Sequence, residues 1–274
     1  MIFMKYQIGL VSKLMDLSAE GLRLYEREGI LLPQREGTAG YRFYERLDIT
    51  SLLRARSYQK YGFSLHEIKQ LIHTDDLTFL TWQYRRKEEE LEREILLKQL
   101  ELEHLHSTRE EIQQFSQSLW KIKRENRPPM YRLEFMRGEE LTLPKEQYDL
   151  LQQWAAWTPL AFSSLRHDWQ AMKRGEDCCY SAIGVLEKSV TSLGIQELSK
   201  QGEYVPECRC LSTIVEVKGE ACSCLDYLSH LMEYVDQNQI EVAGDPISQS
   251  IVSFNKKKNY TRYRKIWLPI LDFT

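Results

Sequence analysis

The feature that most constrains the fold is a stretch of more than forty residues, 82–125, that contains neither proline nor glycine. Charged residues separate apolar ones that recur at intervals of three, four and seven: Leu91, Ile95, Leu102, Leu105, Ile112 and Leu119. This spacing predicts one helix, roughly 60 Å long at 1.5 Å per residue. Pro128 and Pro129 cannot continue a helix and are expected to end it.

A helix of this length with so narrow an apolar stripe is not stable alone in water and needs a partner helix. The alternative is a helix that lies across its own domain, but the predicted length exceeds that of any single small domain. We therefore favour a dimeric coiled coil over residues 77–127, with the six apolar residues at the dimer contact.

The first 76 residues are predicted to form short helices and one hairpin. Apolar spacing places a helix from Ile8 to Met15, and Ser18 is a favourable N-cap for a second helix that Gly29 ends. Two helices joined by so tight a turn form a helix-turn-helix, whose second helix can enter a DNA major groove. A hairpin-like loop, the candidate wing, follows and is marked by turn residues: Pro33, Gly37 and Gly40.

Two further helices complete this region in the prediction. Asp48 is expected to cap a third helix that runs to Tyr61 and stops at Gly62. Ser64 and Glu67 have the spacing of a capping box that opens a fourth helix. We therefore predict an all-α winged helix-turn-helix domain over residues 1–76.

Residues 128–274 have a different pattern. Alternating apolar and polar residues predict strands at 130–136, 178–187, 212–219 and 263–271, with helical patterns near 147–173 and 222–237 between them. Strands and helices arranged in this way favour an α+β domain built on an antiparallel sheet. The whole chain is therefore predicted to be multi-domain.

Composition excludes several classes of protein and leaves the nucleic-acid hypothesis to individual residues. The chain has no apolar run long enough to span a membrane and no signal-peptide pattern at its N-terminus, so we expect a cytoplasmic protein. The net charge of −3 does not favour a general polyanion binder. Residues 1–75 are nearly balanced, with 11 basic and 9 acidic side chains.

The arginines and tyrosines of the first region suit a DNA backbone. Arg23 lies early in the second helix, where a guanidinium reaches guanine or phosphate, and Glu20 occupies the same entry point. Tyr25 and Tyr41 can give phenolic hydrogen bonds to phosphate, while Arg42 at the base of the loop fixes register. The alternative is that these are solvated arginines and half-buried core tyrosines.

All six cysteines lie in the last hundred residues: Cys178, Cys179, Cys208, Cys210, Cys222 and Cys224. In a reducing cytosol they are expected to be thiols. A C-x-C pair on a strand points both sulfurs to one face and could hold a soft metal, but cysteines also pack as small buried hydrophobes. We favour packing and predict no metal site.

Part of the sequence resembles the MerR family of transcription regulators. The resemblance covers residues 5–75, through Ile8-Gly9, Val11-Ser12-Lys13, Leu22 to Glu26, Gly29-Ile30-Leu31, Pro33, Arg35 and Gly40 to Tyr44. Leu24 departs from it, because many members carry an aromatic residue or histidine there. The resemblance and the helix pattern together assign the DNA contacts to seven residues: Ser18, Glu20, Arg23, Tyr25, Tyr41, Arg42 and Lys60.

The resemblance also implies a mechanism. Members of the family dimerise through an antiparallel pair of long helices and sit on promoter DNA between two elements spaced too far apart for RNA polymerase. A bound ligand leads the dimer to bend and untwist that DNA, so the expected partners are double-stranded promoter DNA, RNA polymerase, a second copy of the chain and a small-molecule effector.

Residues 128–274 resemble a GyrI-like effector-binding domain. Carried over by position, the resemblance makes aromatic pocket walls of Phe162, Tyr180, Tyr227 and Tyr263, which suit flat, lipophilic or cationic molecules. Ser248 stands where cation-binding members place a carboxylate. Either Glu187 or Glu216 supplies the charge instead, or the ligand is neutral.

The predicted function is therefore a ligand-responsive transcription regulator that is not an enzyme and needs no cofactor. Two alternatives stay open. Glu187 and Glu216 could serve as the paired carboxylates of a GyrI-like hydrolase, and the C-terminal cysteines could make the protein a metal or thiol sensor.

Overall fold

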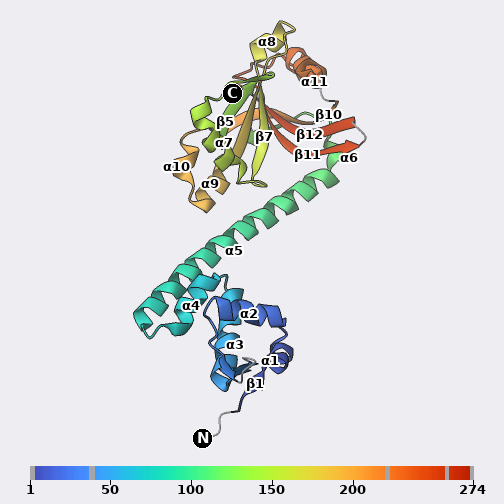
Figure 1. Cartoon of the computed structure of the whole chain (residues 1–274). Coiled ribbons are helices and arrows are strands. Elements are labelled where there is room, and N and C mark those ends of the chain that lie inside the picture. Colours follow the sequence, from blue (N-terminus) through green and yellow to red (C-terminus); the bar gives the residue numbers. More distant parts are fainter. Residues whose placement is uncertain (1–3, 37–40, 220–222, 257–258, 272–274) are drawn as a thin grey trace. The chain divides into compact units, whose positions relative to one another are not determined.

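The computed structural model describes residues 4–36, 41–219, 223–256 and 259–271 (Figure 1). It divides into two compact units, Met1–Glu94 and Ile95–Thr274. Each unit is described by itself. None of the helices in the described residues combines the length and the apolar character needed to cross a membrane.

The first unit combines four short helices with a small antiparallel sheet of order β1-β3-β2. Its elements are β1 (Tyr6–Gln7), α1 (Ile8–Met15), α2 (Ala19–Arg27), β2 (Gln34–Glu36), β3 (Tyr41–Tyr44), α3 (Arg46–Lys60) and α4 (Leu65–His73). The prediction of an all-α domain was therefore wrong in one respect, because β3 pairs with strands on both sides. Gly37 and Gly40 of the predicted loop lie outside the described residues.

The helix boundaries follow their capping residues. The Ser18 hydroxyl accepts a hydrogen bond from the Gly21 amide at the start of α2, as predicted. Ser64 and Glu67 form the predicted capping box of α4. The N-cap of α3 is Glu45 rather than the predicted Asp48, which lies three residues later and accepts a hydrogen bond from the Glu45 amide.

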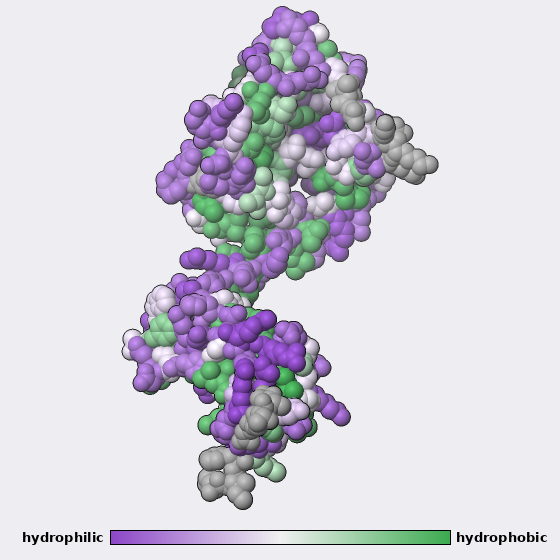
Figure 2. All heavy atoms as spheres, in the orientation of Figure 1, coloured by the Kyte–Doolittle hydropathy of each residue, from purple (hydrophilic) through white to green (hydrophobic). Residues whose placement is uncertain are grey.

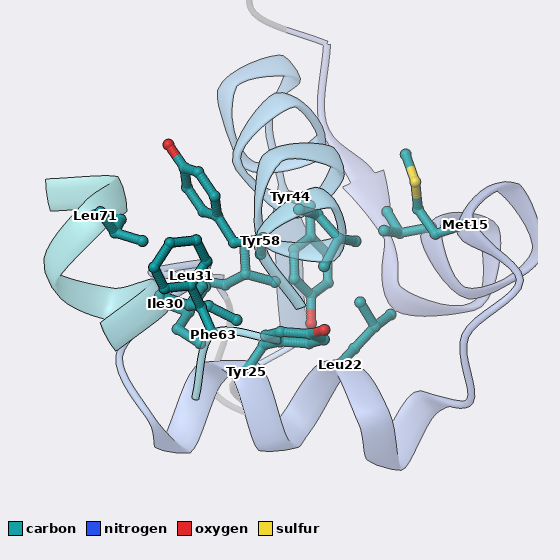
Figure 3. Close-up of a cluster of buried hydrophobic side chains, with 13 residues drawn as sticks. Met15, Leu22, Tyr25, Ile30, Leu31, Tyr44, Tyr58, Phe63 and Leu71 are labelled. Carbon is teal, nitrogen blue, oxygen red and sulfur yellow. The ribbon is translucent and has the colours of Figure 1, made fainter. Parts of the chain in front are cut away.

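A cluster of thirteen buried hydrophobic side chains holds these elements together (Figure 3). Leu22 and Tyr25 from α2 point into this cluster on the side of Tyr44 of β3. One face of α2 is therefore buried in the core. The opposite face of α2 is therefore left for solvent or a partner.

The long helix α5 spans Leu77–Gln113, a length of 37 residues. The predicted helix was correct in kind, but its end near Glu125 was wrong. A short helix, α6 (Phe115–Ser118), follows, and residues Lys123–Arg127 form strand β4. These residues pair with Cys208–Ser212 of β10, and the hydrogen bonds of that ladder override the local helical pattern.

The second unit is built on a nine-stranded sheet. The strands run in the order β4-β10-β12-β11-β7-β8-β5-β6, with β9 also paired to β5, and every named pair is antiparallel as predicted. The remaining bounds are β5 (Met130–Arg137), β6 (Glu140–Leu141), β7 (Ala161–His167), β8 (Cys179–Leu186), β9 (Glu203–Val205), β10 (Cys208–Lys218), β11 (Ile247–Lys256) and β12 (Asn259–Pro269).

Part of the helical prediction for this unit was wrong. Residues 147–173 contain two short helices, α7 (Tyr148–Ala155) and α8 (Trp169–Lys173), with strand β7 between them. β7 lies inside the sheet, between β8 and β11, and both of its edges are paired. Hydrogen bonds to a neighbouring strand on each side hold β7 in the extended conformation, although the local sequence pattern favours a helix.

The sheet has one face covered by helices and one left open. Helices α7, α9 (Glu187–Leu193) and α11 (Cys224–Gln237) bury residues such as Trp154 and Leu228 against the first face. Side chains that point to the other face include Phe162, Lys265 and Trp267, of which Phe162 and Trp267 are themselves buried in a smaller cluster. In the space-filling view, hydrophobic residues coloured green reach the surface among polar residues coloured purple (Figure 2).

Candidate functional site

The exposed face of α2 carries basic side chains. The Arg23 guanidinium lies 3.2 Å and that of Arg27 lies 3.6 Å from the carboxylate of Glu20, and all three side chains are largely exposed. Exposed ion pairs of this kind contribute at most about 1 kcal/mol, so the guanidiniums can exchange this partner for another anion at little cost.

Glu26 fixes the hairpin of β2 and β3 to α2. Its carboxylate accepts hydrogen bonds from Arg35 and Arg42, each at 2.6 Å. Burial, the largest influence, raises the pKa of Glu26, but the hydrogen bonds from Arg42 and Arg35 outweigh it and lower the pKa overall. Both arginines are thereby held beside α2, while Tyr41 is exposed.

The structure gives Tyr25 a different environment from the arginines. Its side chain is only 4% exposed, and its hydroxyl donates to the side-chain oxygen of Gln59 at 2.8 Å. Burial raises the pKa of this phenol. Tyr25 therefore packs α2 against α3, while Lys60 at the end of α3 is exposed.

A cavity of about 170 Å³ lies in the second unit, between the second half of α5 and the open face of the sheet. Phe162 and Trp267 give it aromatic walls, and His104, Thr108 and Glu111 of α5 give it polar ones. The ring of Phe162 lies directly over Gly184, where an added β-carbon would come within 2.5 Å of it. The absence of a side chain at Gly184 therefore lets the Phe162 ring lie close against the backbone of β8.

A polar cluster centred on Glu125 of β4 lies beside this cavity, because two of its members, Lys265 and Trp267, line the cavity while Glu125 itself does not. Glu125 was not singled out in the sequence analysis. Its carboxylate accepts hydrogen bonds from the Trp267 indole at 2.9 Å, Lys265 at 2.9 Å and Lys123 at 2.8 Å. Burial, the largest influence, raises its pKa, but the two lysines lower the pKa to about 2. All five residues of this strand, Lys123–Arg127, are polar, so no apolar–polar alternation marks it in the sequence.

Glu111 contrasts with Glu125. It faces the cavity from α5, and burial, the largest influence, raises the pKa of its carboxyl while nearby Lys265 lowers it. Glu111, in the cavity lining, thus takes up a proton more readily than Glu125, which lies outside the lining.

Of the five ligand residues predicted from sequence, the structure brings only Phe162 to this cavity. Tyr227 and Ser248 belong to the helix-covered face, where the Tyr227 hydroxyl lies 3.1 Å from His167 Nε2 and the Ser248 hydroxyl accepts from Arg264 at 3.0 Å.

Tyr263 and Tyr180 lie elsewhere on the sheet. Tyr263 stacks on Phe115 with ring centres 4.6 Å apart and donates its hydroxyl hydrogen to Glu216 at 2.8 Å. The guanidinium of Arg137 lies 5.3 Å from the ring centre of Tyr180. The four predicted ligand residues outside the cavity, Tyr180, Tyr227, Ser248 and Tyr263, therefore each contact another side chain of the protein.

The two carboxylates considered for hydrolysis are also separate. Glu216 on β10 is engaged by Tyr263 and by Lys218, and Glu187 begins α9 after β8. In the sheet order, β12, β11 and β7 lie between β10 and β8, which places the two strands about 19 Å apart at 4.8 Å per strand. This spacing does not form a carboxylate pair.

The side of α5 that faces away from the cavity carries several exposed apolar side chains. At 100° per residue, Leu102 lies about 200° around the helix from His104. Leu102 is 52% exposed and Leu105 61% exposed, and Ile95 and Ile112 are exposed as well. Leu91 is partly buried. Leu119 lies beyond α6 and forms an isolated bridge with Ile214, so the predicted stripe ends before it.

The cysteines do not form a conventional metal site. Cys208 and Cys210 lie on one face of β10 with their sulfurs 3.5 Å apart. Cys222 lies outside the described residues, and within the part of the chain that the structure describes no group of three or more His, Cys, Asp or Glu side chains is arranged to hold a metal ion.

Comparison with known proteins concerns mainly the first unit. Residues 6–75 match the model of the MerR HTH family regulatory protein. The HTH-type transcriptional regulator CueR of Vibrio cholerae is 35% identical over 65 residues, which is 24% of this chain and 47% of that protein. A probable heavy metal-dependent transcriptional regulator of Haemophilus influenzae is 38% identical over 65 residues, 24% of this chain and 51% of the relative.

The chain thus spans about half the length of the curated relatives it matches. A cryo-EM structure of an EcmrR–DNA complex aligns over 98% of this chain and 100% of that chain, at 17% identity and a TM-score of 0.36. A TM-score this low carries no argument about the present protein.

The Glu125 cluster predicts a defined pH dependence. The pKa of Glu125 falls from an ordinary 4.5 to about 2 on folding, so it contributes stability above pH 4.5 that is lost as the pH falls toward 2. Glu125→Gln is expected to reduce the free energy of unfolding at neutral pH by up to about 3 kcal/mol and to flatten the decline below pH 4.5. Urea unfolding followed by tryptophan fluorescence measures both. Glu146→Gln, at an exposed position, is the control, and an unchanged acid limb in Glu125→Gln contradicts the assignment.

Proposed function

We propose, on the premise that the chain is a MerR-family transcription regulator as residues 6–75 indicate, that it binds promoter DNA as a dimer and responds to a small molecule bound in the second unit. The observation that carries the proposal is the division of α2 into a face buried in the core and a face that presents Arg23 and Arg27. Because the core contacts of α2 lie on the opposite face, the helix can bind in a DNA groove without losing the contacts that fold the first unit.

In the proposed complex α2 enters the major groove and the β2–β3 hairpin acts as a wing on the backbone. Arg23 contacts a base edge or phosphate, and Arg42, Tyr41 and Lys60 hold phosphates. Ser18 and Glu20 position the start of α2, because the first caps the helix and the second pairs with Arg23. Tyr25 acts indirectly by holding α2 against α3.

The proposed dimer forms through the apolar side of α5. Ile95, Leu102, Leu105 and Ile112 leave a continuous exposed stripe, which is costly in water and is covered when a second copy packs against it. The same arrangement frees the opposite side of the helix for the cavity.

The proposed coupling follows from this double use of α5. His104, Thr108 and Glu111 line the cavity, and the same helix continues without a break back to Leu77. A ligand that prefers one position of α5 shifts the population of that position, and the dimer then distorts the promoter spacer for RNA polymerase. Phe162 and Trp267 favour a small molecule with a flat apolar face. The chain is proposed to bind rather than to hydrolyse it, in the cytoplasm.

The first test concerns DNA. Arg23→Ala is expected to weaken binding to the chain's own promoter by about 1–3 kcal/mol, because a guanidinium contact in the groove is lost. Fluorescence anisotropy at several salt concentrations measures this. Lys145→Ala removes one exposed positive charge from the second unit and is expected to change nothing. Equal binding by Arg23→Ala and the wild type would exclude α2 as the recognition helix.

The second test concerns the dimer. Leu102→Lys is expected to convert the dimer to a monomer, since it places a charge in the centre of the apolar stripe. Sedimentation equilibrium reports the mass. Glu110→Lys, at an exposed position of α5 off the stripe, serves as the matched control. A dimer that persists in Leu102→Lys shows that this stripe is not the contact.

The third test concerns the cavity. Thr108→Trp fills a space of about 170 Å³ and is expected to abolish any rise in melting temperature produced by small aromatic compounds. A thermal-shift screen on the wild type supplies the compounds, and Glu110→Trp places the same side chain on the exposed surface of α5. Compounds that stabilise Thr108→Trp as strongly as the wild type bind elsewhere.

A further inference from the structure

A short segment joins the end of α5 to the sheet, and the proposed function leaves it unused. Helix α5 ends at Gln113, α6 (Phe115–Ser118) adds one more turn, and β4 begins at Lys123. In Figure 1, α6 follows the end of α5 and lies beside the part of the sheet that carries β11 and β12. The contacts of residues 114–122 with the sheet therefore determine where the long helix is held on it.

One of these contacts is made by side chains alone. The ring of Phe115 stacks on that of Tyr263 in β12, with the ring centres 4.6 Å apart and the planes at 22°. Tyr263 is itself held in place, because its hydroxyl donates to Glu216 at 2.8 Å and its ring centre lies 5.8 Å from that of Phe254. An aromatic pair of this kind is a modest interaction, so the two rings can separate without unfolding the domain around them.

The second contact is made by the main chain. Leu119 forms a bridge with Ile214 of β10, and the Trp120 amide donates to the Ile214 carbonyl at 2.8 Å. The Trp120 ring also meets the ring of His230 of α11 edge to face, with the ring centres 5.1 Å apart. These contacts fix Leu119 and Trp120 to the sheet, so the position of the helical chain before them depends on Phe115.

The stacked rings lie next to the cavity, although Phe115 and Tyr263 are not part of its lining. Lys265, two residues from Tyr263, points to the same face of β12 and lines the cavity. Glu111 of α5 lines the cavity about one helical turn before Phe115, because four residues separate the two. A molecule that packs against Glu111 and Lys265 therefore sets the distance between α5 and β12 beside the stack.

We propose that the Phe115–Tyr263 stack is the positioning contact that couples the cavity to α5. The inference rests on the proposed function, in which a bound molecule shifts this helix and thereby changes how the dimer holds promoter DNA. The structure contains the stacked position. A molecule that favours a second position, in which the rings separate, must offset the loss of the stack. Removal of the Phe115 ring eliminates this cost and populates the second position without a bound molecule.

The test uses the full chain and a reference compound. This is the aromatic compound from the thermal-shift screen that loses its effect with Thr108→Trp and that changes transcription by purified RNA polymerase from the chain's own promoter. With Phe115→Ala, transcription without the compound is expected to match that of the wild type with it, so the response falls below about twofold. Calorimetry is expected to show that Phe115→Ala binds the compound about 2–10-fold more tightly, because no stack is broken.

Three further variants separate the stack from general packing. Phe115→Tyr keeps a ring at this position and is expected to keep the wild-type response. Phe254→Ala removes the other ring beside Tyr263, but that ring belongs to the sheet and is 52% exposed, so the response is expected to stay unchanged. Tyr263→Leu removes the partner ring and is expected to reproduce Phe115→Ala. Circular dichroism checks that every variant folds.

The possible failures point to different conclusions. A wild-type response in Phe115→Ala, or a constant level equal to that of the wild type without compound, overturns this inference alone. Weaker binding of the compound by Phe115→Ala also overturns it, because the ring then only packs the cavity wall. A wild type that responds to none of the compounds that bind the cavity contradicts the proposed function instead.

Discussion

The second unit depends on one helix that meets two different demands. The half of α5 beyond Ile95 places His104, Thr108 and Glu111 over a sheet and leaves Leu102 and Leu105 exposed on its other side. A helix can do this only because residues three or four apart share a face while those two apart do not. The polar side lines the cavity, whereas the other side leaves the apolar side chains of Leu102 and Leu105 exposed to water.

The two faces of the sheet also bury different side chains, because successive residues of a strand point to opposite faces. Its helix-covered face buries Arg264 and the open face buries Arg132, and neither side chain is more than 3% exposed. Ser248 and Ser164 each accept one hydrogen bond from these arginines, and burial, the largest influence, lowers the pKa of both to about 10. Burying two guanidiniums reduces stability unless their donors are satisfied; Arg132 also donates to Glu203 and Arg264 to the Ser163 carbonyl, while Nη2 of Arg132 has no partner.

Local signals predicted the first unit well. Ser18 and the Ser64–Glu67 box set helix starts through hydrogen bonds between residues three apart, so they can be read from sequence. The end of α5 and the presence of β7 could not be read in this way. Both depend on pairing with strands far along the chain, which local periodicity does not encode.

The residues of the candidate sites also fall into those that local sequence signals predict and those that depend on contacts with distant parts of the chain. The exposure of Arg23 on α2 was predictable because the buried positions of that helix are regular, whereas Arg27 was not singled out. Tyr25 is engaged by Gln59, 34 residues away. The cavity was not predictable beyond Phe162. Its lining brings α5 together with four separate strands, β7, β8, β11 and β12. Glu125, beside the cavity, was unrecognised because it lay in a segment expected to be helical.

The carboxylate of Glu26 pairs with the two arginines that a DNA phosphate could otherwise contact, Arg35 and Arg42. Arg35 and Arg42 are already neutralised when the protein meets a polyanion, and they change partners rather than gain one. The free energy gained when these arginines bind a phosphate is then only the small difference between their attraction to the phosphate and their attraction to Glu26. In the DNA complex proposed above, such a surface is expected to dissociate quickly from arbitrary sequence and to be retained only where additional, shape-dependent contacts form.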